Sequence, residues 1–273
     1  MILLLPLLML NAPSASEIMS RVAENQARAQ TARTKFVYDM NVFVRLKRAN
    51  GKLAREESRD YVVVPEEKGS KRKLTKLEGK VLEGKKETPY TEEGYRVKNV
   101  DIDGEIVDSF AKDVMWNKGD FGPMVDWFPL TPNEVSRYTF TLAGEEKYRD
   151  YDVYKIDFVE HDEDDSCWRG EALIEKNEFQ PVLVTAEWAC RIPLAVKALL
   201  GTNVSEIGAK ITYRKFDDGV WFPVNCGGEL KLRVLFLYAR TIAFTAQNSG
   251  FRKADVQTNV TFDKTAETTP SVP

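Results

Sequence analysis

The chain has a single histidine, His161, and only three cysteines among its 273 residues. One histidine rules out a multi-His metal site and argues against a Ser-His-Asp or Cys-His nucleophile system. The sequence also lacks a Cys-x-x-Cys pair and a Gly-rich phosphate loop, so nucleotide-binding, zinc-ribbon and redox classes have no support. No pair of carboxylates stands out in an apolar context that would raise a pKa. We therefore expect a protein that is not an enzyme and that uses no cofactor and no metal.

The carboxylates next to His161 are best interpreted as a solvated turn. The run from Glu160 to Asp165 is rich in oxygen ligands, but the ordered spacing and the glycine of a calcium loop are absent. A hairpin tip in solvent is favoured, and a weak calcium site is the alternative.

An excess of charge of one sign is missing as well. The formal net charge is -3, with 39 basic and 42 acidic residues, so no global field attracts nucleic acid or an anionic membrane. Residues 66–88 are a local exception with eight Lys or Arg and five Glu. We interpret them as a solvated hairpin, and the alternative is a cationic surface that steers anionic headgroups.

Long apolar runs are confined to the start of the sequence. Residues 1–10 are apolar and small residues follow, as in the apolar region and cleavage site of a secretory signal peptide, which we place at 1–16. The run is shorter than the roughly 20 residues that span a bilayer, and no Lys or Arg precedes it. A buried N-terminal helix is the alternative, which Pro6 disfavours. We expect a periplasmic protein, secreted through its signal peptide, with no transmembrane segment in the mature chain.

The cysteines are compatible with an oxidising compartment. If the chain turns tightly at Glu178-Phe179, Cys167 and Cys190 stand opposite each other on neighbouring strands, and a disulfide between them is possible. A change of register by one residue removes that pairing.

What the sequence has in abundance is strict alternation of apolar and polar residues. In residues 36–47 one face carries Phe36, Tyr38, Met40, Val42, Val44 and Leu46, and the other carries Asp39, Asn41, Arg45 and Lys47. A period of two over this length is typical of a strand with one dry face and one wet face.

Most of the remaining chain follows the same rule. Residues 14–33 form the expected long helix, in which Ser14 and Glu17 have the spacing of a capping box. Further strands are expected at 53–64, 138–144, 154–158, 167–176, 181–189, 209–216, 220–223, 229–239, 241–247 and 254–262. Residues 71–77 and 80–83 are expected as two strands broken by Gly79. Alternation stops in an aromatic insertion at 101–132, and a short helix is expected at 192–200.

This order predicts a mainly β (α+β) fold in which a single large antiparallel curved sheet forms an unclosed β-barrel, with a long N-terminal helix and a short helical lid. The domain spans 17–262, and the Thr/Pro-rich tail 263–273 is expected to be disordered. Side chains of a sheet this wide do not fill its interior, so a cavity is expected.

One block of the sequence resembles a known family. It contains the patterns Tyr-x-Phe-x-Leu-x-Gly, Tyr-x-x-Tyr-x-Ile-x-Phe, Trp-x-Gly-x-x-Leu-Ile and Phe-x-Pro-Val in that order. Their residues are Tyr138, Phe140, Leu142, Gly144, Tyr151, Tyr154, Ile156, Phe158, Trp168, Gly170, Leu173, Ile174, Phe179, Pro181 and Val182. The order resembles the outer-membrane lipoprotein-sorting family, the LolA/LolB-like superfamily, over roughly residues 17–262. The insertion and the charged hairpin depart from that plan.

The resemblance implies a soluble exported carrier or binding protein for lipid or lipoprotein acyl chains, held in an apolar cavity between the curved sheet and the lid. An envelope sensor or assembly factor that binds envelope proteins through the same fold is the alternative. Nucleic acid is not an expected partner. The cavity candidates are Phe36, Tyr38, Met40, Val42, Val44, Trp116, Trp127, Phe128, Phe140, Ile156 and Phe158. Ordinary core packing is the alternative for each of them, and a plug is the alternative for the aromatic insertion.

Overall fold

The computed structural model describes residues 13–66, 69–111, 130–161, 168–188, 203–216, 218–234 and 238–254. Within them one sheet holds eleven antiparallel strands, in the order β4-β3-β2-β1-β11-β10-β9-β8-β7-β6-β5. The strands are β1 (Phe36–Arg48), β2 (Leu53–Glu66), β3 (Gly69–Glu83), β4 (Lys86–Tyr90), β5 (Tyr138–Tyr148), β6 (Tyr151–Glu160), β7 (Trp168–Glu175), β8 (Gln180–Trp188), β9 (Asn203–Lys215), β10 (Trp221–Val234) and β11 (Tyr238–Lys253).

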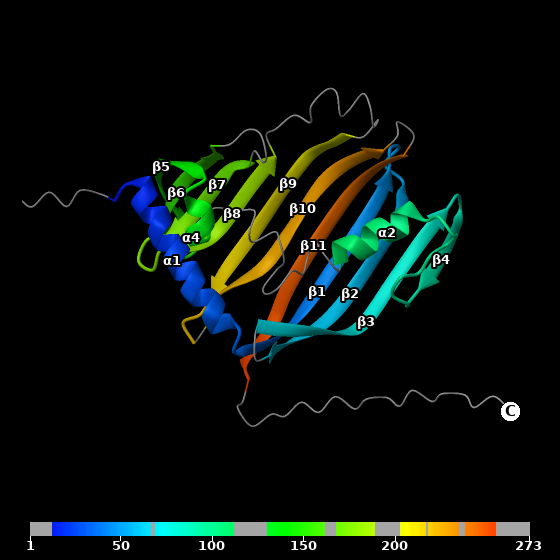
Figure 1. Ribbon diagram of the computed structural model, residues 1–273, viewed down its shortest axis with the longest axis horizontal. Coiled ribbons are helices and arrows are strands. Elements are labelled where there is room, and N and C mark those ends of the chain that lie inside the picture. The colour runs from blue at the N-terminus through cyan, green and yellow to red at the C-terminus, as the bar shows by residue number, and fades with distance from the viewer. Residues whose placement is uncertain are drawn as a thin grey trace, which may run out of the picture.

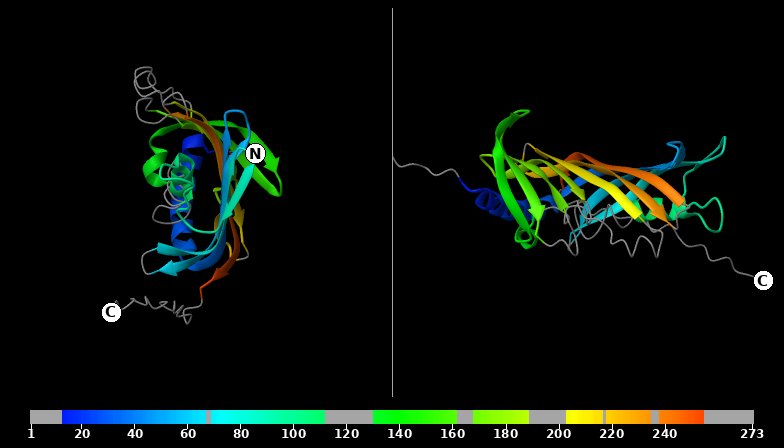
Figure 2. Two further views of the ribbon diagram at one scale, coloured as in Figure 1. Left: turned by 90° about the vertical axis from the view of Figure 1, so that its right-hand side faces the viewer. Right: turned by 90° about the horizontal axis from the view of Figure 1, so that it is seen from above.

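The sheet is curved and unclosed, with β4 and β5 as its two edges (Figure 1). The helices α1 (Ala15–Arg33), α2 (Ile102–Ser109) and α4 (Pro132–Val135) lie on one side of it, which we call the inner face (Figure 2). The predicted fold class is confirmed. The expected helix at 192–200 and the expected strand beyond Ala254 lie outside the described residues, as do 1–12 and the tail 263–273, so the domain boundaries stay predictions.

Helix α1 begins where the sequence places it. Ser14 is its N-cap, its side chain accepts a hydrogen bond from the Glu17 backbone, and the Glu17 carboxylate accepts one from the Ser14 backbone at 2.8 Å. This reciprocal pair satisfies two backbone donors that a helix end leaves unpaired. Ile18, Met19 and Val22 are fully buried against the sheet.

Three expectations about the strands are wrong. Gly79 does not interrupt β3, because it stands opposite Tyr90 and leaves room for the Tyr90 ring, 2.1 Å from where a Cβ would lie. β10 continues from Trp221 to Val234 and β11 begins at Tyr238, so the expected division between strands at residues 239–241 is wrong. The expected strands at 220–223 and 229–239 are therefore one strand, β10.

The register of β7 and β8 differs by one residue from the one that places Cys167 opposite Cys190. Trp168 faces Trp188, and the connection is a four-residue turn in which Phe179 adopts a φ of 50°. A longer turn shifts every facing pair, so the register argument for the disulfide is wrong. Both cysteines lie outside the described residues.

Candidate functional site

The predicted inner-face residues of β1 are all buried. Phe36, Tyr38, Met40, Val42 and Val44 are at most 4% exposed, and Leu46 continues the same face. The alternate positions Asp39 and Lys47 are exposed. The period of two therefore identified both the strand and its buried side.

These residues belong to rows that run across the sheet. One row of directly paired residues crosses seven neighbouring strands, in the order β1, β11, β10, β9, β8, β7 and β6. Its members, in the same order, are Val42, Ala246, Cys226, Ile211, Val184, Ala172 and Ile156. Each of the seven is at most 1% exposed. Burial raises the pKa of the Cys226 thiol to about 12, so this cysteine stays protonated and acts as a small apolar side chain.

The next row combines small residues with two aromatic rings. Gly228, Ala209, Ala186 and Gly170 follow one another between Phe244 and Phe158. A Cβ on Gly228 would lie 2.8 Å from the Phe244 ring, and one on Gly170 would lie 2.7 Å from the Phe158 ring. The two rings therefore lie over the neighbouring glycines. Between the rings, this row of the inner face carries no side chain larger than a methyl group.

The other sequence-predicted site residues have separate outcomes. Ile156 and Phe158 are buried in these rows, whereas Phe140, at the edge strand β5, is half-buried. Trp116, Trp127 and Phe128 lie outside the described residues. The burial of the described candidates is a finding, and their contact with a ligand stays a prediction.

Towards β2 the apolar rows end in a charged cluster that the sequence interpretation missed. Arg59 stands opposite Val42, Glu57 opposite Val44 and Arg55 opposite Leu46. All three β2 side chains are at most 3% exposed. They face α2 and the segment that precedes it, and together with Tyr90, Asp101 and Asp108 we call them the β2–α2 cluster.

Arg55 joins β2 to the start of α2. Its guanidinium donates to the Asp101 carboxylate at 2.9 Å, to the Tyr95 carbonyl at 2.7 Å and to the Tyr90 hydroxyl at 2.8 Å. Asp101 also caps α2 by accepting from the Gly104 backbone at 3.0 Å. The Asp101 carboxylate therefore both caps the N-terminus of α2 and forms the ion pair with Arg55.

Arg59 joins the same strand to the other end of α2. It donates to Glu57, to Asp108 at 2.5 Å and to Glu93 at 3.2 Å. The Tyr90 hydroxyl donates to Glu57 at 2.6 Å. Each buried charge is thus paired and hydrogen-bonded, the condition under which buried ions are tolerated.

The cluster changes the acidity of its members. Burial and the neighbouring Glu57 raise the pKa of Tyr90 well above its usual value. Burial alone would raise the pKa of Asp101, but the hydrogen bonds from the backbones of Val97 and Gly104 and the charge of Arg55 outweigh it and hold that pKa below its usual value. Both groups therefore keep their protonation state throughout the neutral range.

The sequence contained only part of the signal for this cluster. Residues 49–51 do form the turn between β1 and β2, but the pairing next to that turn, Lys47 with Leu53, would place Ser58 opposite Val42 if it continued along β1. A register shift between Leu46 and Lys47 brings Arg59 there instead, and local sequence does not show that shift. Helix α2 had a weaker signal, because Asp103-Gly104 is typical of a turn. Gly104 lies in the helix at a point where a Cβ would be 2.7 Å from the Arg55 guanidinium.

The contacts described for helix α1 with the other half of the sheet are mainly apolar. Arg33 donates to the Trp221 carbonyl at 2.7 Å, and the Gln26 amide donates to the Gln180 side chain at 2.5 Å. Ile18, Met19 and Val22 provide the apolar contact. This half of the inner face is covered by a helix that is mostly apolar towards the sheet.

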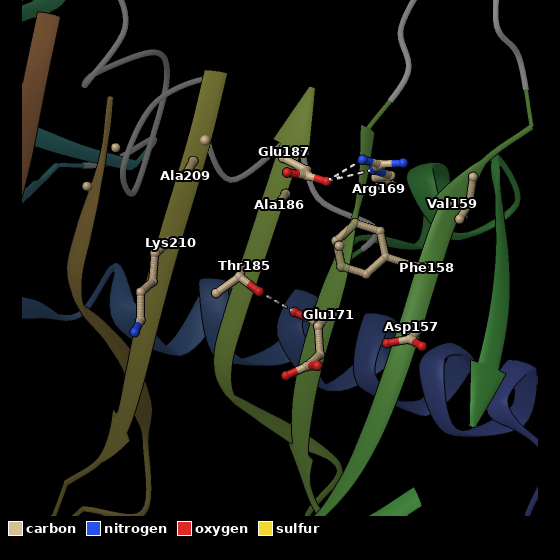
Figure 3. Close-up of a pocket in the computed structure, with 14 residues that line it drawn as sticks. Asp157, Phe158, Val159, Arg169, Glu171, Thr185, Ala186, Glu187, Ala209 and Lys210 are labelled. Atoms are coloured by element: carbon tan, nitrogen blue, oxygen red, sulfur yellow. Dashed lines mark hydrogen bonds and ion pairs between the residues drawn. The ribbon is translucent and has the colours of Figure 1, made fainter. Parts of the chain in front are cut away.

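The outer face carries a shallow hollow of about 670 Å³ across β6 to β10 (Figure 3). Gly208 and Gly227 leave its floor without side chains. Its rim holds Lys210, Thr185 and an ion pair of 2.7 Å between Arg169 and Glu187. A second hollow of about 440 Å³ adjoins it and shares Lys210 and Gly227. Of the sequence-predicted site residues, Phe158 is among those that line the larger hollow (Figure 3).

The described part of the chain contains no group of three or more His, Cys, Asp and Glu side chains that could hold a metal ion. His161 Nε2 lies 2.6 Å from the Thr139 hydroxyl, and both residues are exposed. Among the described helices none is long and apolar enough to cross a membrane.

No protein-family model matches the chain, and no curated protein matches it. Its fold is similar to that of 22 solved chains. A LolA superfamily protein from Nitrosomonas europaea is 14% identical with a TM-score of 0.32, covering 90% of this chain and 96% of that one. A domain from Vibrio parahaemolyticus, described as a putative outer membrane lipoprotein-sorting protein, is 15% identical with a TM-score of 0.37, covering 89% and 93%.

The complex of MucA and MucB from Pseudomonas aeruginosa also contains a similar chain, which is 9% identical with a TM-score of 0.24 and coverage of 88% and 99%. At these scores the likenesses carry no argument about activity, ligand or partner. The LolA-like fold that the residue pattern predicts agrees with the observed architecture, an unclosed antiparallel sheet with helices on its inner face.

Proposed function

We propose that this protein is an exported carrier or binding protein for lipid or lipoprotein acyl chains, which it holds against the inner face of the sheet. The observation that carries the proposal is the row from Val42 to Ile156, seven apolar side chains on seven strands. An acyl chain is an apolar ligand whose affinity comes from burying methylenes, at about 0.8 kcal/mol each. A wide apolar wall suits such a ligand.

The second row of the inner face, which we call the small-residue row, suggests where the acyl chain would lie. Between Phe244 and Phe158 the wall consists of Gly228, Ala209, Ala186 and Gly170. A methylene chain packs closely against glycine and alanine, and aromatic rings at both ends provide contact area at low entropic cost.

The β2–α2 cluster gives the proposed site a boundary. Acyl chains gain nothing from contact with Arg55, Glu57 and Arg59, because these charges are already paired with one another and with Asp101 and Asp108. The apolar ligand would therefore occupy the part of the inner face between β1 and β6.

The test uses two adjacent residues of β9 that face opposite sides of the sheet. Ala209→Phe places a ring in the small-residue row, whereas Lys210→Phe places the same ring on the outer face. Native mass spectrometry of the purified protein, followed by organic extraction, measures the bound lipid. We expect lipid with the unmodified chain and with Lys210→Phe, and several-fold less with Ala209→Phe. Thermal melting confirms that both variants are folded.

Two results would refute the proposal. One is the absence of extractable lipid from the unmodified chain after reconstitution with phospholipid. The other is equal lipid retention by the two folded variants, because the phenylalanine ring at position 209 would occupy space that a ligand on the inner face needs.

A second candidate, a sensor or assembly factor that binds another protein, is favoured by the contrast between the sheet edges. β4 is short and contains Pro89, which protects an edge from further pairing. β5 is longer, and Tyr138 to Leu142 contain no charge, proline or glycine. An open edge of this kind accepts an extended partner segment. Binding of a partner by delipidated protein, and its loss in Thr141→Pro, would distinguish this candidate from the carrier.

A further inference from the structure

Two of the most exposed large apolar side chains lie where the loop before α2 meets the first residue of that helix. Val100 is 72% exposed and Ile102 is 43% exposed, and they flank Asp101, the residue that caps α2 and binds Arg55. Because Asp101 must point inward, its two neighbours in the chain are directed to solvent. Exposed aliphatic side chains that are adjacent mark a contact surface more often than single ones.

The loop lies at an end of the sheet that is rich in lysine. Asp103 of α2 binds Arg240, and Arg240 is paired in register with Arg48, the last residue of β1. Arg48 in turn donates to the Leu82 carbonyl near the end of β3. The loop 97–102, the β1–β2 turn and the β3–β4 turn therefore meet at one end, which we call the lysine-rich end (Figure 1).

Five lysines at this end are exposed, and none forms an ion pair with another described residue: Lys47, Lys52, Lys85, Lys86 and Lys98. The nearby carboxylates are mostly engaged. Asp101 binds Arg55, Asp103 binds Arg240 and Glu105 binds Arg96. Glu83 and Glu87 are the exposed acids beside the β3–β4 turn, and Glu87 pairs with Lys80, so the five lysines leave this end with an excess of positive charge.

We propose that the lysine-rich end docks on the surface of an anionic lipid bilayer, with Val100 and Ile102 entering the interface and the lysines contacting the headgroups. Apolar insertion and attraction to anionic lipid together are the combination by which peripheral proteins bind membranes reversibly. The overall charge of the protein is slightly negative, so the attraction is local to this end and decays within a Debye length.

The position of the loop links docking to the inner face. The same six residues that present Val100 and Ile102 carry Asp101, whose bonds to Arg55 and Gly104 hold the start of α2 against β2. Contact with a bilayer would thus occur where α2 is attached. Docking does not depend on whether the inner face holds lipid, so it goes beyond the proposed carrier function.

Vesicle flotation tests the proposal with the full chain. The vesicles contain phosphatidylcholine with about one third phosphatidylglycerol, or phosphatidylcholine alone, at low and at physiological salt. We expect binding to the anionic vesicles that weakens with salt, and about a tenfold lower partition coefficient for the double variant Val100→Ser with Ile102→Ser. Lys98→Gln should lower it by a smaller factor.

The controls are residues of the same type elsewhere on the surface. Val159, 53% exposed on β6, is changed to Ser, and Lys210 of β9 is changed to Gln. Both should bind vesicles as the unmodified chain does. Failure of the unmodified chain to bind anionic vesicles, or equal binding by the double variant and the Val159→Ser control, overturns the proposal. Lipid extraction from the double variant separates this result from the carrier proposal, because its inner face is unchanged.

Discussion

Two helices cover the inner face of one sheet, and they are held there by different forces. Helix α1 lies against the half that contains β5 to β10, and its contacts are apolar side chains supplemented by Arg33 and Gln26. Helix α2 lies against β2 and is held by the buried pairs of Arg55 with Asp101 and of Arg59 with Asp108. Apolar contacts are insensitive to pH and tolerate shifts, whereas ion pairs are directional and depend on protonation. The two halves should therefore respond differently to substitution and to acid.

The largest expected effect is at the centre of the β2–α2 cluster. Arg59→Met leaves Glu57 buried without its cation and removes one cation from Asp108, and we expect the free energy of unfolding to fall by about 3–5 kcal/mol. Urea denaturation measures it. Arg45→Met is the matched control, because Arg45 pairs with Glu56 at 2.9 Å on the outer face with 43% of its side chain exposed. There the loss should be about 0–1 kcal/mol; similar losses for the two variants would show that burial of the cluster does not matter.

A comparable effect is expected under α1, from a different cause. Ile18 is fully buried, so Ile18→Ala creates a cavity and should cost about 2–5 kcal/mol, whereas exposed Glu24→Ala should cost about 0.5 kcal/mol or less. Urea denaturation of the double variant Ile18→Ala with Arg59→Met tests whether the halves are independent. Losses that add would support the comparison, and a coupling above about 0.5 kcal/mol would contradict it.

The smallest effect is the dependence on pH. The pKa of Asp101 is lowered in the folded protein, so its contribution to stability is present above the usual carboxyl value of 3.8 and is lost as the pH falls through the lower folded value. Amide hydrogen exchange, corrected for the intrinsic rate at each pH, should show α2 losing protection below about pH 4. Beyond its first turn, where the pKa of Glu17 is also lowered by its hydrogen bonds from Ser14, helix α1 should keep its protection to lower pH.

Asp101→Asn is the control for this measurement. Asparagine still caps α2 but carries no charge, so protection of α2 should be weaker at neutral pH and should change less between pH 5 and the acid range. An unchanged acid response in this variant would assign the loss of protection to another carboxylate.

The sequence predicted the elements with regular patterns and missed those defined by contacts between distant segments. The strand from Phe36 to Arg48 and the capping box of Ser14 and Glu17 were correct, because both are set by local spacing. The uninterrupted β3 was missed because only the paired strand shows that Gly79 makes room for Tyr90. Helix α2 was missed because the pair Asp103-Gly104 is usually a turn signal. Here both residues lie in the first turn of a helix that Asp101 caps.

The candidate site followed the same division. The apolar rows were predictable for β1 and β6, where alternation is strict. The charged face of β2 was not, because Arg55, Glu57 and Arg59 alternate with other polar residues and neither side of the strand is visibly apolar. Nor does local spacing show that Val100 and Ile102 are exposed on either side of an inward-pointing Asp101.

The amino-acid order by itself determined that one side of a long run of strands is apolar and that one capped helix precedes it, because a side-chain period of two or of 3.6 is written directly in the sequence. Only the tertiary structure decided where the apolar side ends and which charges are buried. Those outcomes depend on register and on the partners that an antiparallel sheet brings together from positions far apart in the chain, and no local pattern contains that information.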